Sequence, residues 1–171
     1  MDNLKTLFSE EILQMRINEL AKQIDSDYKG KELVVVSILK GAIYFTADLT
    51  KKMKTPILLQ TFKAHSYEGT ESTGNVVIQN DLDINIAGKD VLIVEDIIDS
   101  GRTLDKVRNY MLSKNPNSLK FAVLLDKKDK RVVNVPVDYI GFDIPNKFII
   151  GYGFDYDEKY INIPYIWYLD I

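Results

Sequence analysis

Three carboxylates lie close together in the middle of the chain, at Glu95, Asp96 and Asp99. Adjacent carboxylates such as Glu95 and Asp96 suit a magnesium ion or the hydroxyls of a sugar, and they would repel a phosphate. Asp99 stands between this pair and the small polar residues that follow, which is a suitable position for a general base. These residue types predict a site that binds a sugar and moves a proton beside it.

A short turn of small and polar residues follows the carboxylates directly. Its backbone N–H groups, two hydroxyls and one cation at the start of a helical pattern favour an anion, above all a phosphate. Gly101 lets the backbone approach a phosphate closely, because it has no side chain. The residues predicted to bind the phosphate are Ser100, Gly101, Arg102 and Thr103.

The elements on either side would hold these groups in place. Residues 91–94 form an unbroken apolar run, and helical spacing of apolar residues begins after Thr103. Such a run suits a strand that is buried on both faces of a parallel sheet. The polar string therefore lies where a strand enters a helix, which is where open α/β sheets bind ligands. A solvated acidic loop could explain any one of these residues, but it does not account for the whole string.

The string VLIVEDIIDSGRTL at residues 91–104 resembles the signature of the phosphoribosyltransferases, and its DIIDSG part resembles the 6-oxopurine branch of that family. The resemblance implies a type I phosphoribosyltransferase fold, an α/β domain whose central, mostly parallel sheet is flanked by helices and carries a small hood. The implied reaction belongs to purine salvage. It transfers the phosphoribosyl group of phosphoribosyl pyrophosphate (PRPP) to hypoxanthine and/or guanine, giving IMP or GMP and pyrophosphate, with Asp99 taking a proton from N7 of the purine.

The resemblance also implies the residues that meet the other parts of the substrates. Lys40 and Gly41, after the first expected strand, would bind pyrophosphate. Lys127 would hydrogen-bond the exocyclic oxygen of the purine and disfavour a 6-amino group. Phe148 would stack on the purine ring, and Ile149 would offer backbone groups to its edge. Without the resemblance, Lys40-Gly41 is a common strand-end turn and Phe148 is a core residue.

A magnesium cofactor and a lid are implied in the same way. The implied metal residues are Glu95, Asp96 and Asp155, and Ser66 and Tyr67 are the implied lid pair that closes over the reacting centre. One position departs from the family, because Ile161 stands where an arginine usually binds pyrophosphate. Lys159 and Arg131 are cations nearby in sequence that could take over this contact.

The composition limits the classes of partner and compartment. The chain has 171 residues, no cysteine and a formal net charge of −3, with no long basic run. We therefore expect one domain over residues 1–171, with a hood from the N-terminal segment and about residues 128–171, and no nucleic-acid partner. The N-terminal residues are unlike a signal peptide, and no apolar run approaches the ~20 residues that span a bilayer. We expect a cytoplasmic enzyme with no membrane partner that forms a homodimer or homotetramer.

The expected elements alternate between strands and helices. Helices are expected from the cap at Ser9 to residue 24, over residues 42–54 and from residue 103. Strands are expected at 33–39, 57–62, 91–94, 119–125, 137–142 and 148–152, with a last edge strand at 165–169. Two βαβ units follow from this order and predict parallel, right-handed connections. Residues 64–74 form a polar break suited to a mobile lid, and residues 75–79 are a candidate hairpin arm.

Three other classes of protein share parts of this pattern. An RNA-binding regulator built on this fold would need a basic face, which the net charge disfavours. A pyrimidine or adenine phosphoribosyltransferase would lack the DIID string and the base pocket from Lys127 to Phe148. A nucleotide-binding subunit without catalysis requires that Asp99 has no role. The ranking of hypoxanthine, guanine and xanthine, and the choice between dimer and tetramer, stay open.

Overall fold

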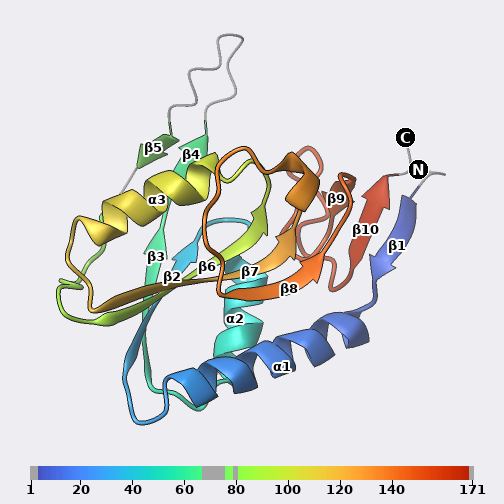
Figure 1. The fold of residues 1–171 in the computed structure, drawn as a ribbon. Coiled ribbons are helices and arrows are strands. Elements are labelled where there is room, and N and C mark those ends of the chain that lie inside the picture. The colour runs from blue at the N-terminus through green and yellow to red at the C-terminus, as the bar shows by residue number, and fades with distance from the viewer. Residues whose placement is uncertain (1–3, 67–75, 79–80, 170–171) are drawn as a thin grey trace.

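The computed structural model describes residues 4–66, 76–78 and 81–169, and its centre is a five-stranded parallel sheet (Figure 1). The strands run in the order β3-β2-β6-β7-β8, and every neighbouring pair is parallel. Their bounds are Leu33–Ile38 for β2, Ile57–Phe62 for β3, Asp90–Ile98 for β6, Ser118–Asp126 for β7 and Tyr139–Asp143 for β8. The continuous apolar runs of β2, β6 and β7 are buried, as expected for strands covered on both faces.

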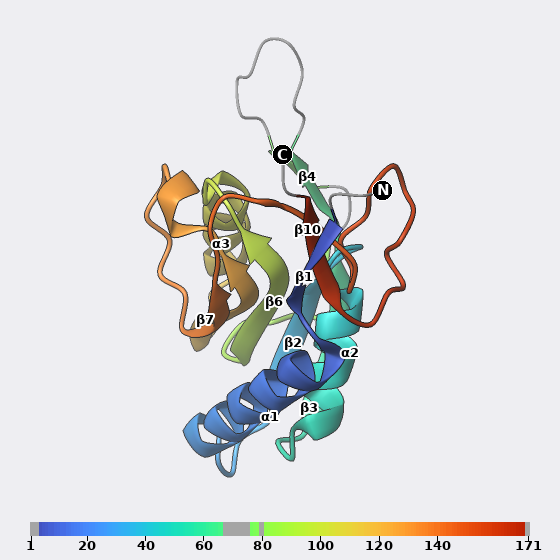
Figure 2. The same cartoon turned by 90° about the vertical axis from the view of Figure 1, so that its right-hand side faces the viewer.

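Helices cover both faces of this sheet (Figures 1 and 2). Helix α1, Glu10–Asp27, and helix α2, Ile43–Lys52, pack on one face around Val35 and Leu92. Helix α3, Arg102–Leu112, packs on the other face around Val34 and Val36. The predicted cap of α1 is present, because Ser9 Oγ accepts a hydrogen bond from the backbone N–H of Ile12 at 3.3 Å. A single 3₁₀ turn, η1, Lys128–Lys130, follows β7.

A three-stranded antiparallel sheet forms the hood from both ends of the chain (Figure 2). Its order is β1-β10-β9, with bounds Leu4–Phe8, Ile166–Leu169 and Phe148–Ile150. The α/β class with a mostly parallel sheet and a small hood is thus confirmed. The predicted C-terminal strand is present as β10, but its expected position at the edge was wrong, because β10 lies between β1 and β9. Strand β1 was not predicted, since its conformation depends on a partner at the other end of the chain.

A short hairpin rises from the sheet before β6. Strand β4, Ala64–Ser66, pairs antiparallel with β5, Val76–Ile78. The predicted hairpin arm at residues 75–79 is confirmed, whereas residues 64–66 form its partner strand and do not belong to a loop. Within the described ranges, no helix is long and apolar enough to cross a membrane.

Candidate active site at the carboxyl edge of the sheet

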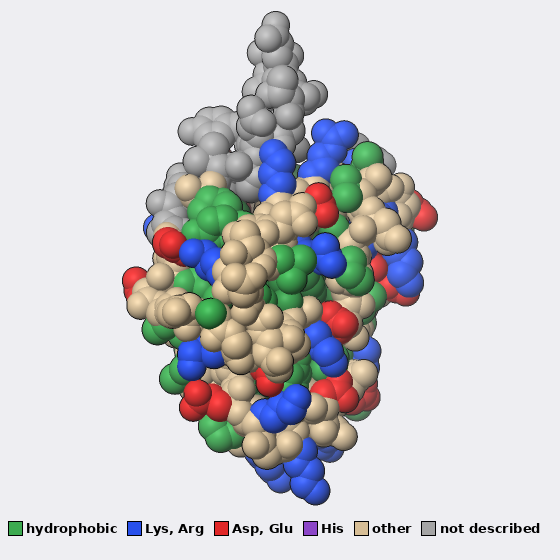
Figure 3. Space-filling model, turned by 60° about the vertical axis from the view of Figure 1, so that its left-hand side comes forward, with side chains coloured by type: hydrophobic (Ala, Val, Ile, Leu, Met, Phe, Trp, Pro, Cys, Tyr) green, Lys and Arg blue, Asp and Glu red, His purple; other side chains and the backbone are tan. Residues whose placement is uncertain are grey.

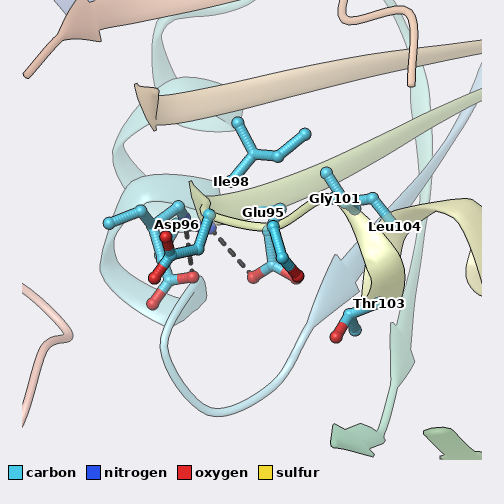
Figure 4. A pocket seen from close by; sticks show the side chains of 9 residues that line it. Glu95, Asp96, Ile98, Gly101, Thr103 and Leu104 are labelled. Carbon is cyan, nitrogen blue, oxygen red and sulfur yellow. Dashed lines mark hydrogen bonds between the residues drawn. The ribbon is translucent and has the colours of Figure 1, made fainter. Parts of the chain in front are cut away.

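Strand β6 carries two of the three predicted carboxylates, Glu95 and Asp96, within the strand itself. We predicted that the strand would end at Val94, but it continues to Ile98 because Glu95, Ile97 and Ile98 still pair with β7. The backbone N–H of Asp96 donates to Glu95 Oε1 at 3.0 Å, and that of Ile97 donates to Asp96 Oδ1 at 2.7 Å (Figure 4). The two carboxylates are therefore held by the backbone of an ordered strand.

The environment of this pair disfavours two negative charges. Glu95 is only 8% exposed, and burial together with the neighbouring Asp96 carboxylate raises its pKa well above the ordinary value. Burial also raises the pKa of Asp96, although hydrogen bonds from Glu95 and the backbone oppose that effect. A cation or several hydroxyl donors beside the pair would stabilise its ionised form. The site is thus suited to a positively charged or hydroxyl-rich ligand.

The predicted phosphate turn forms one wall of a cavity of about 200 Å³ beside these carboxylates (Figure 4). Gly101 precedes α3 with φ at +84°, and a Cβ at this position would lie 2.5 Å from the carbonyl oxygen of Val133. The carbonyl of Ser100 accepts hydrogen bonds from Val132 and Val133 at 2.9 and 3.0 Å, which holds the turn from behind. The first N–H groups of α3 have no partner within the helix, and that of Arg102 donates to Ser100 Oγ at 3.3 Å.

A second cavity of about 400 Å³ adjoins the first, because Asp96, Ile97 and Asp99 line both. Asp99 is exposed at this shared boundary. The second cavity brings together segments that are far apart in sequence. Its other lining residues are Leu39, Lys40, Gly41, Lys127, Phe148, Ile149, Gly153, Phe154, Asp155 and Ile161.

Glycines set the shape of this cavity beside Lys40. A Cβ on Gly41 would overlap the carboxylate of Asp96, and a Cβ on Gly153 would overlap the carbonyl oxygen of Gly41. The turn after β2 is therefore packed between β6 and the loop after β9, with the Leu39–Lys40 peptide in the cis form. Lys40 Nζ lies 3.7 Å from Glu158 Oε1, and both side chains are largely exposed. Gly153 was not among the predicted site residues, although it lies in the run GYGFDYDEKY, which resembles the family pattern.

The opposite end of the second cavity offers one aromatic ring and one buried cation. Phe148 is 46% exposed and makes an edge contact with Tyr156, with ring centroids 5.8 Å apart. Phe148 is thus no core residue. Lys127 is buried, and its backbone N–H donates to the carbonyl of Ile98 at 3.0 Å. Ile149 lies in β9, an edge strand, so that part of the strand's backbone is not used by the sheet.

A largely buried ion pair between Arg131 and Asp126 connects the turn at Gly101 with the segment before Lys127, and it was not predicted. Arg131 Nη2 contacts Asp126 Oδ1 at 2.5 Å, and Arg131 Nη1 donates to the carbonyl of Val135 at 3.4 Å. Asp126 directly precedes Lys127, while the stem of Arg131 packs under Gly101. Arg131 is therefore engaged in a structural ion pair and is a poor substitute for the missing arginine at position 161.

The carboxylates fit a magnesium ion that is bound together with a phosphate-bearing substrate. Within residues 4–66, 76–78 and 81–169, no cluster of three or more acidic, histidine or cysteine side chains could hold a metal alone. Magnesium is commonly held by one or two carboxylates plus substrate phosphates. Asp96 and Asp155 line the same cavity, and Glu95 adjoins Asp96. Of the predicted lid pair, Ser66 ends β4, and Tyr67 lies outside the described residues.

Known proteins share this sequence and architecture. The family model of the phosphoribosyl transferase domain matches residues 4–157. The hypoxanthine-guanine phosphoribosyltransferase of Streptococcus thermophilus is 46% identical over 166 residues, which are 96% of this chain and 92% of that protein. The hypoxanthine phosphoribosyltransferase of Escherichia coli is also 46% identical, over 95% of this chain and 93% of its own length.

Solved structures of the same kind superpose closely. The hypoxanthine-guanine phosphoribosyltransferase of Bacillus anthracis matches with a TM-score of 0.92 at 46% identity, covering 96% of this chain and 98% of that one. The hypoxanthine phosphoribosyltransferase of Staphylococcus aureus matches with a TM-score of 0.93 at 44% identity, covering 98% and 92%. With its signature strand, paired cavities and hood, the chain belongs to the hypoxanthine-guanine phosphoribosyltransferases of the type I phosphoribosyltransferase family.

Proposed function

We propose that this chain, a purine-salvage phosphoribosyltransferase by its family, joins N9 of hypoxanthine or guanine to C1 of the ribose in PRPP. The bond from C1 to the pyrophosphate oxygen breaks, the bond from C1 to N9 forms, and the purine loses its N7 proton. The observation that carries this proposal is the pair of adjoining cavities, with a helix-start anion site in one and an exposed aromatic ring beside a buried lysine in the other.

The smaller cavity would hold the ribose 5′-phosphate. The N–H groups at the start of α3 and the hydroxyls of Ser100 and Thr103 supply donors for its oxygens, and Arg102 supplies a positive charge. Gly101 keeps the turn open to the phosphate because it has no side chain. The carboxylates of Glu95 and Asp96 would accept hydrogen bonds from the ribose hydroxyls, which neutralises part of their mutual repulsion.

The larger cavity would hold the purine and position it for attack. Phe148 offers its ring for stacking, Lys127 donates to the 6-oxygen, and the edge backbone near Ile149 meets the remaining purine atoms. A 6-amino purine would present a donor to Lys127 and leave the buried lysine unpaired. Asp99, at the boundary of the two cavities, takes the N7 proton as the C1–N9 bond forms.

The leaving pyrophosphate would lie along the turn after β2. Lys40 and the backbone at Gly41 would bind it, and Asp96, Asp155 and the adjoining Glu95 would hold magnesium. When bound, the metal offsets the negative charge that develops on the leaving group. Ser66 and Tyr67 would close over the reacting centre and exclude water.

The remaining expectations stay predictions. They are a single domain over residues 1–171, a cytoplasmic location, a homodimer or homotetramer, and no nucleic-acid partner. On the face drawn in Figure 3, basic and acidic side chains are interspersed, which is not the continuous basic surface that a nucleic acid requires.

The test is a transferase assay of the purified chain with PRPP, magnesium and a panel of bases. We expect nucleotide and pyrophosphate in equal amounts with hypoxanthine or guanine, and far slower reaction with adenine. Removal of magnesium by a chelator should abolish the product. Equal rates with hypoxanthine and adenine would show that Lys127 does not select the base, and no product with any base would overturn the proposed function.

A further inference from the structure

Tyr152 has an unusual place in the loop that follows β9. It is 4% exposed and adopts a left-handed backbone conformation with φ at +52°, between Gly151 and Gly153. A residue other than glycine rarely adopts this conformation unless tertiary contacts hold it. Its backbone N–H donates to the carbonyl of Ile163 at 2.7 Å, and that of Gly153 donates to Ile161 at 2.9 Å. The loop is thus held in a defined shape along its own backbone.

The side chain of Tyr152 reaches away from the hood to helix α2. Its hydroxyl donates to Asp48 Oδ2 at 2.6 Å, and the same oxygen accepts a hydrogen bond from Gln14 Nε2 of α1 at 2.8 Å. Lys51 Nζ lies 3.4 Å from the other oxygen of Asp48. Burial raises the pKa of Asp48, but the hydrogen bonds from Tyr152, Gln14 and Lys51 outweigh it and lower the pKa overall. Asp48 is therefore an ionised acceptor, and its bond with the tyrosine is charge-assisted.

These contacts join two walls of the larger cavity. Helix α2 begins at Ile43, directly after the turn that contains Lys40 and Gly41. Gly153, next to Tyr152, packs against the carbonyl of Gly41. The loop after β9 therefore meets the turn–helix segment at two points, once by close backbone packing and once through the hydroxyl of Tyr152. Neither contact involves Lys127, in the part of the cavity proposed for the base. The backbone N–H of Lys127 instead donates to the carbonyl of Ile98 in β6.

We propose that the Tyr152–Asp48 hydrogen bond is a positioning pair that sets the separation of the Lys40–Gly41 turn from the loop at residues 151–155. This inference rests on the proposed function, because that separation is where the pyrophosphate of PRPP would lie. A preorganised pair of walls avoids the cost of ordering them when the ligand binds. The pair contacts no reacting atom, so its effect falls on the binding of PRPP and pyrophosphate more than on the chemical step.

The test is Tyr152→Phe, which removes the hydroxyl and keeps the ring that contacts Tyr44 at a centroid distance of 6.2 Å. We expect KM for PRPP and Kd for magnesium pyrophosphate to rise about tenfold, the effect of losing one hydrogen bond to a charged group. The turnover number kcat and KM for hypoxanthine should change by less than about twofold, because positioning acts before the chemical step.

A matched control is available at the other end of the sheet. Tyr139 is also buried, and its hydroxyl donates to Asp27 Oδ2 at 2.5 Å. Tyr139→Phe removes the same kind of bond far from the cavities, so it should lower the melting temperature and leave KM for PRPP unchanged. If Tyr139→Phe weakens PRPP binding as much as Tyr152→Phe does, the effect is general destabilisation and the inference fails.

The acceptor provides a second pair of variants, which decides the question if Tyr152→Phe does not fold. Asp48→Asn keeps a carbonyl oxygen for the tyrosine hydroxyl but removes the charge, so its PRPP affinity should lie between those of the wild type and Tyr152→Phe, whereas Asp48→Ala should match Tyr152→Phe. Equal PRPP affinity in Asp48→Ala and the wild type would overturn the inference. A wild-type chain without transferase activity would overturn the proposed function instead, so the two failures are distinguishable.

Discussion

The two cavities of the site are built in different ways. The smaller cavity, proposed for the 5′-phosphate, comes from one continuous stretch, in which β6, the turn and the start of α3 follow each other directly. The larger cavity, proposed for pyrophosphate and the base, is assembled from six separate stretches, around Lys40, Asp96, Lys127, Phe148, Asp155 and Ile161. A continuous strand–turn–helix supplies its own geometry, whereas an assembled cavity depends on how distant backbones pack. The two halves should therefore respond differently to substitution.

The first variant tests this comparison at Asp99, which lines both cavities. Asp99→Asn removes the predicted base but keeps the size of the side chain at the boundary of both cavities. Because a positioned general base contributes typically about 10²–10⁴ in rate, kcat should fall by about that factor while KM for PRPP changes little. Steady-state kinetics with saturating substrates measures it. Turnover close to wild type would show that Asp99 is not the base.

The second variant targets the assembled half. Gly153→Ala would force a Cβ into the carbonyl oxygen of Gly41. Displacement of that turn by about 1 Å can cost on the order of 10² in kcat/KM for PRPP. Gly88→Ala is the matched control, because Gly88 also has a positive φ, at +73°, but its Cβ would meet no atom within 4 Å. The control should lose stability and keep kcat/KM. Equal losses in the two variants would refute the packing argument.

The third variant concerns the position at which this chain departs from its family. Ile161 lines the larger cavity, and its carbonyl accepts a hydrogen bond from the backbone N–H of Gly153. Ile161→Arg adds charge-assisted donors, which contribute roughly 1.5–3 kcal/mol, or about ten- to a hundredfold in affinity. Pyrophosphate binding should tighten and KM for PRPP should fall, with KM for the base unchanged.

Calorimetry at fixed magnesium and salt measures this effect, because ionic strength screens exposed charges. Ile161→Met controls for side-chain length without charge and should bind pyrophosphate as the wild type does. If the arginine variant binds no better than the methionine variant, the departure at position 161 has no bearing on pyrophosphate.

The smallest expected effect is on stability and lies in the continuous half. Burial and the neighbouring carboxylate raise the pKa of Glu95, so the folded state disfavours its charge. The double variant Glu95→Gln, Asp96→Asn removes both charges and should stabilise the ligand-free chain at pH 8 by about 1 kcal/mol, or about 2–4 °C in Tm. Activity should fall at the same time, because the ribose and magnesium lose their carboxylates.

The pH dependence of that gain follows from the sign of the pKa shift. Between the ordinary value of 4.5 and its raised folded value, the folded Glu95 binds more protons than the unfolded chain. The wild type therefore loses stability as pH rises through this window, and the advantage of the double variant disappears below about pH 4.5. Thermal melts of both forms from pH 4 to 8 measure it. A constant difference in Tm across this range would contradict the assignment to buried charge.

The same contrast explains what the sequence could predict. The sequence predicted that residues of the stretch from Glu95 to Thr103 lie together, because these residues and the strand, turn and helix that hold them are adjacent in the chain. The carboxyl end of β6 was misplaced by four residues, because pairing with β7 continues through polar positions that have weak strand preference. Gly153, the Arg131–Asp126 pair and strand β1 were missed, since each acquires its role from a partner distant in sequence.

The most direct test of the central claim is a crystal structure of the chain with IMP, pyrophosphate and magnesium. We predict the 5′-phosphate of IMP on the turn at Ser100–Thr103, the purine against Phe148 with its 6-oxygen at Lys127, and pyrophosphate at the Lys40–Gly41 turn. A 5′-phosphate bound at the Lys40–Gly41 turn, or a purine away from Phe148, would contradict this division of the site between its continuous and assembled halves.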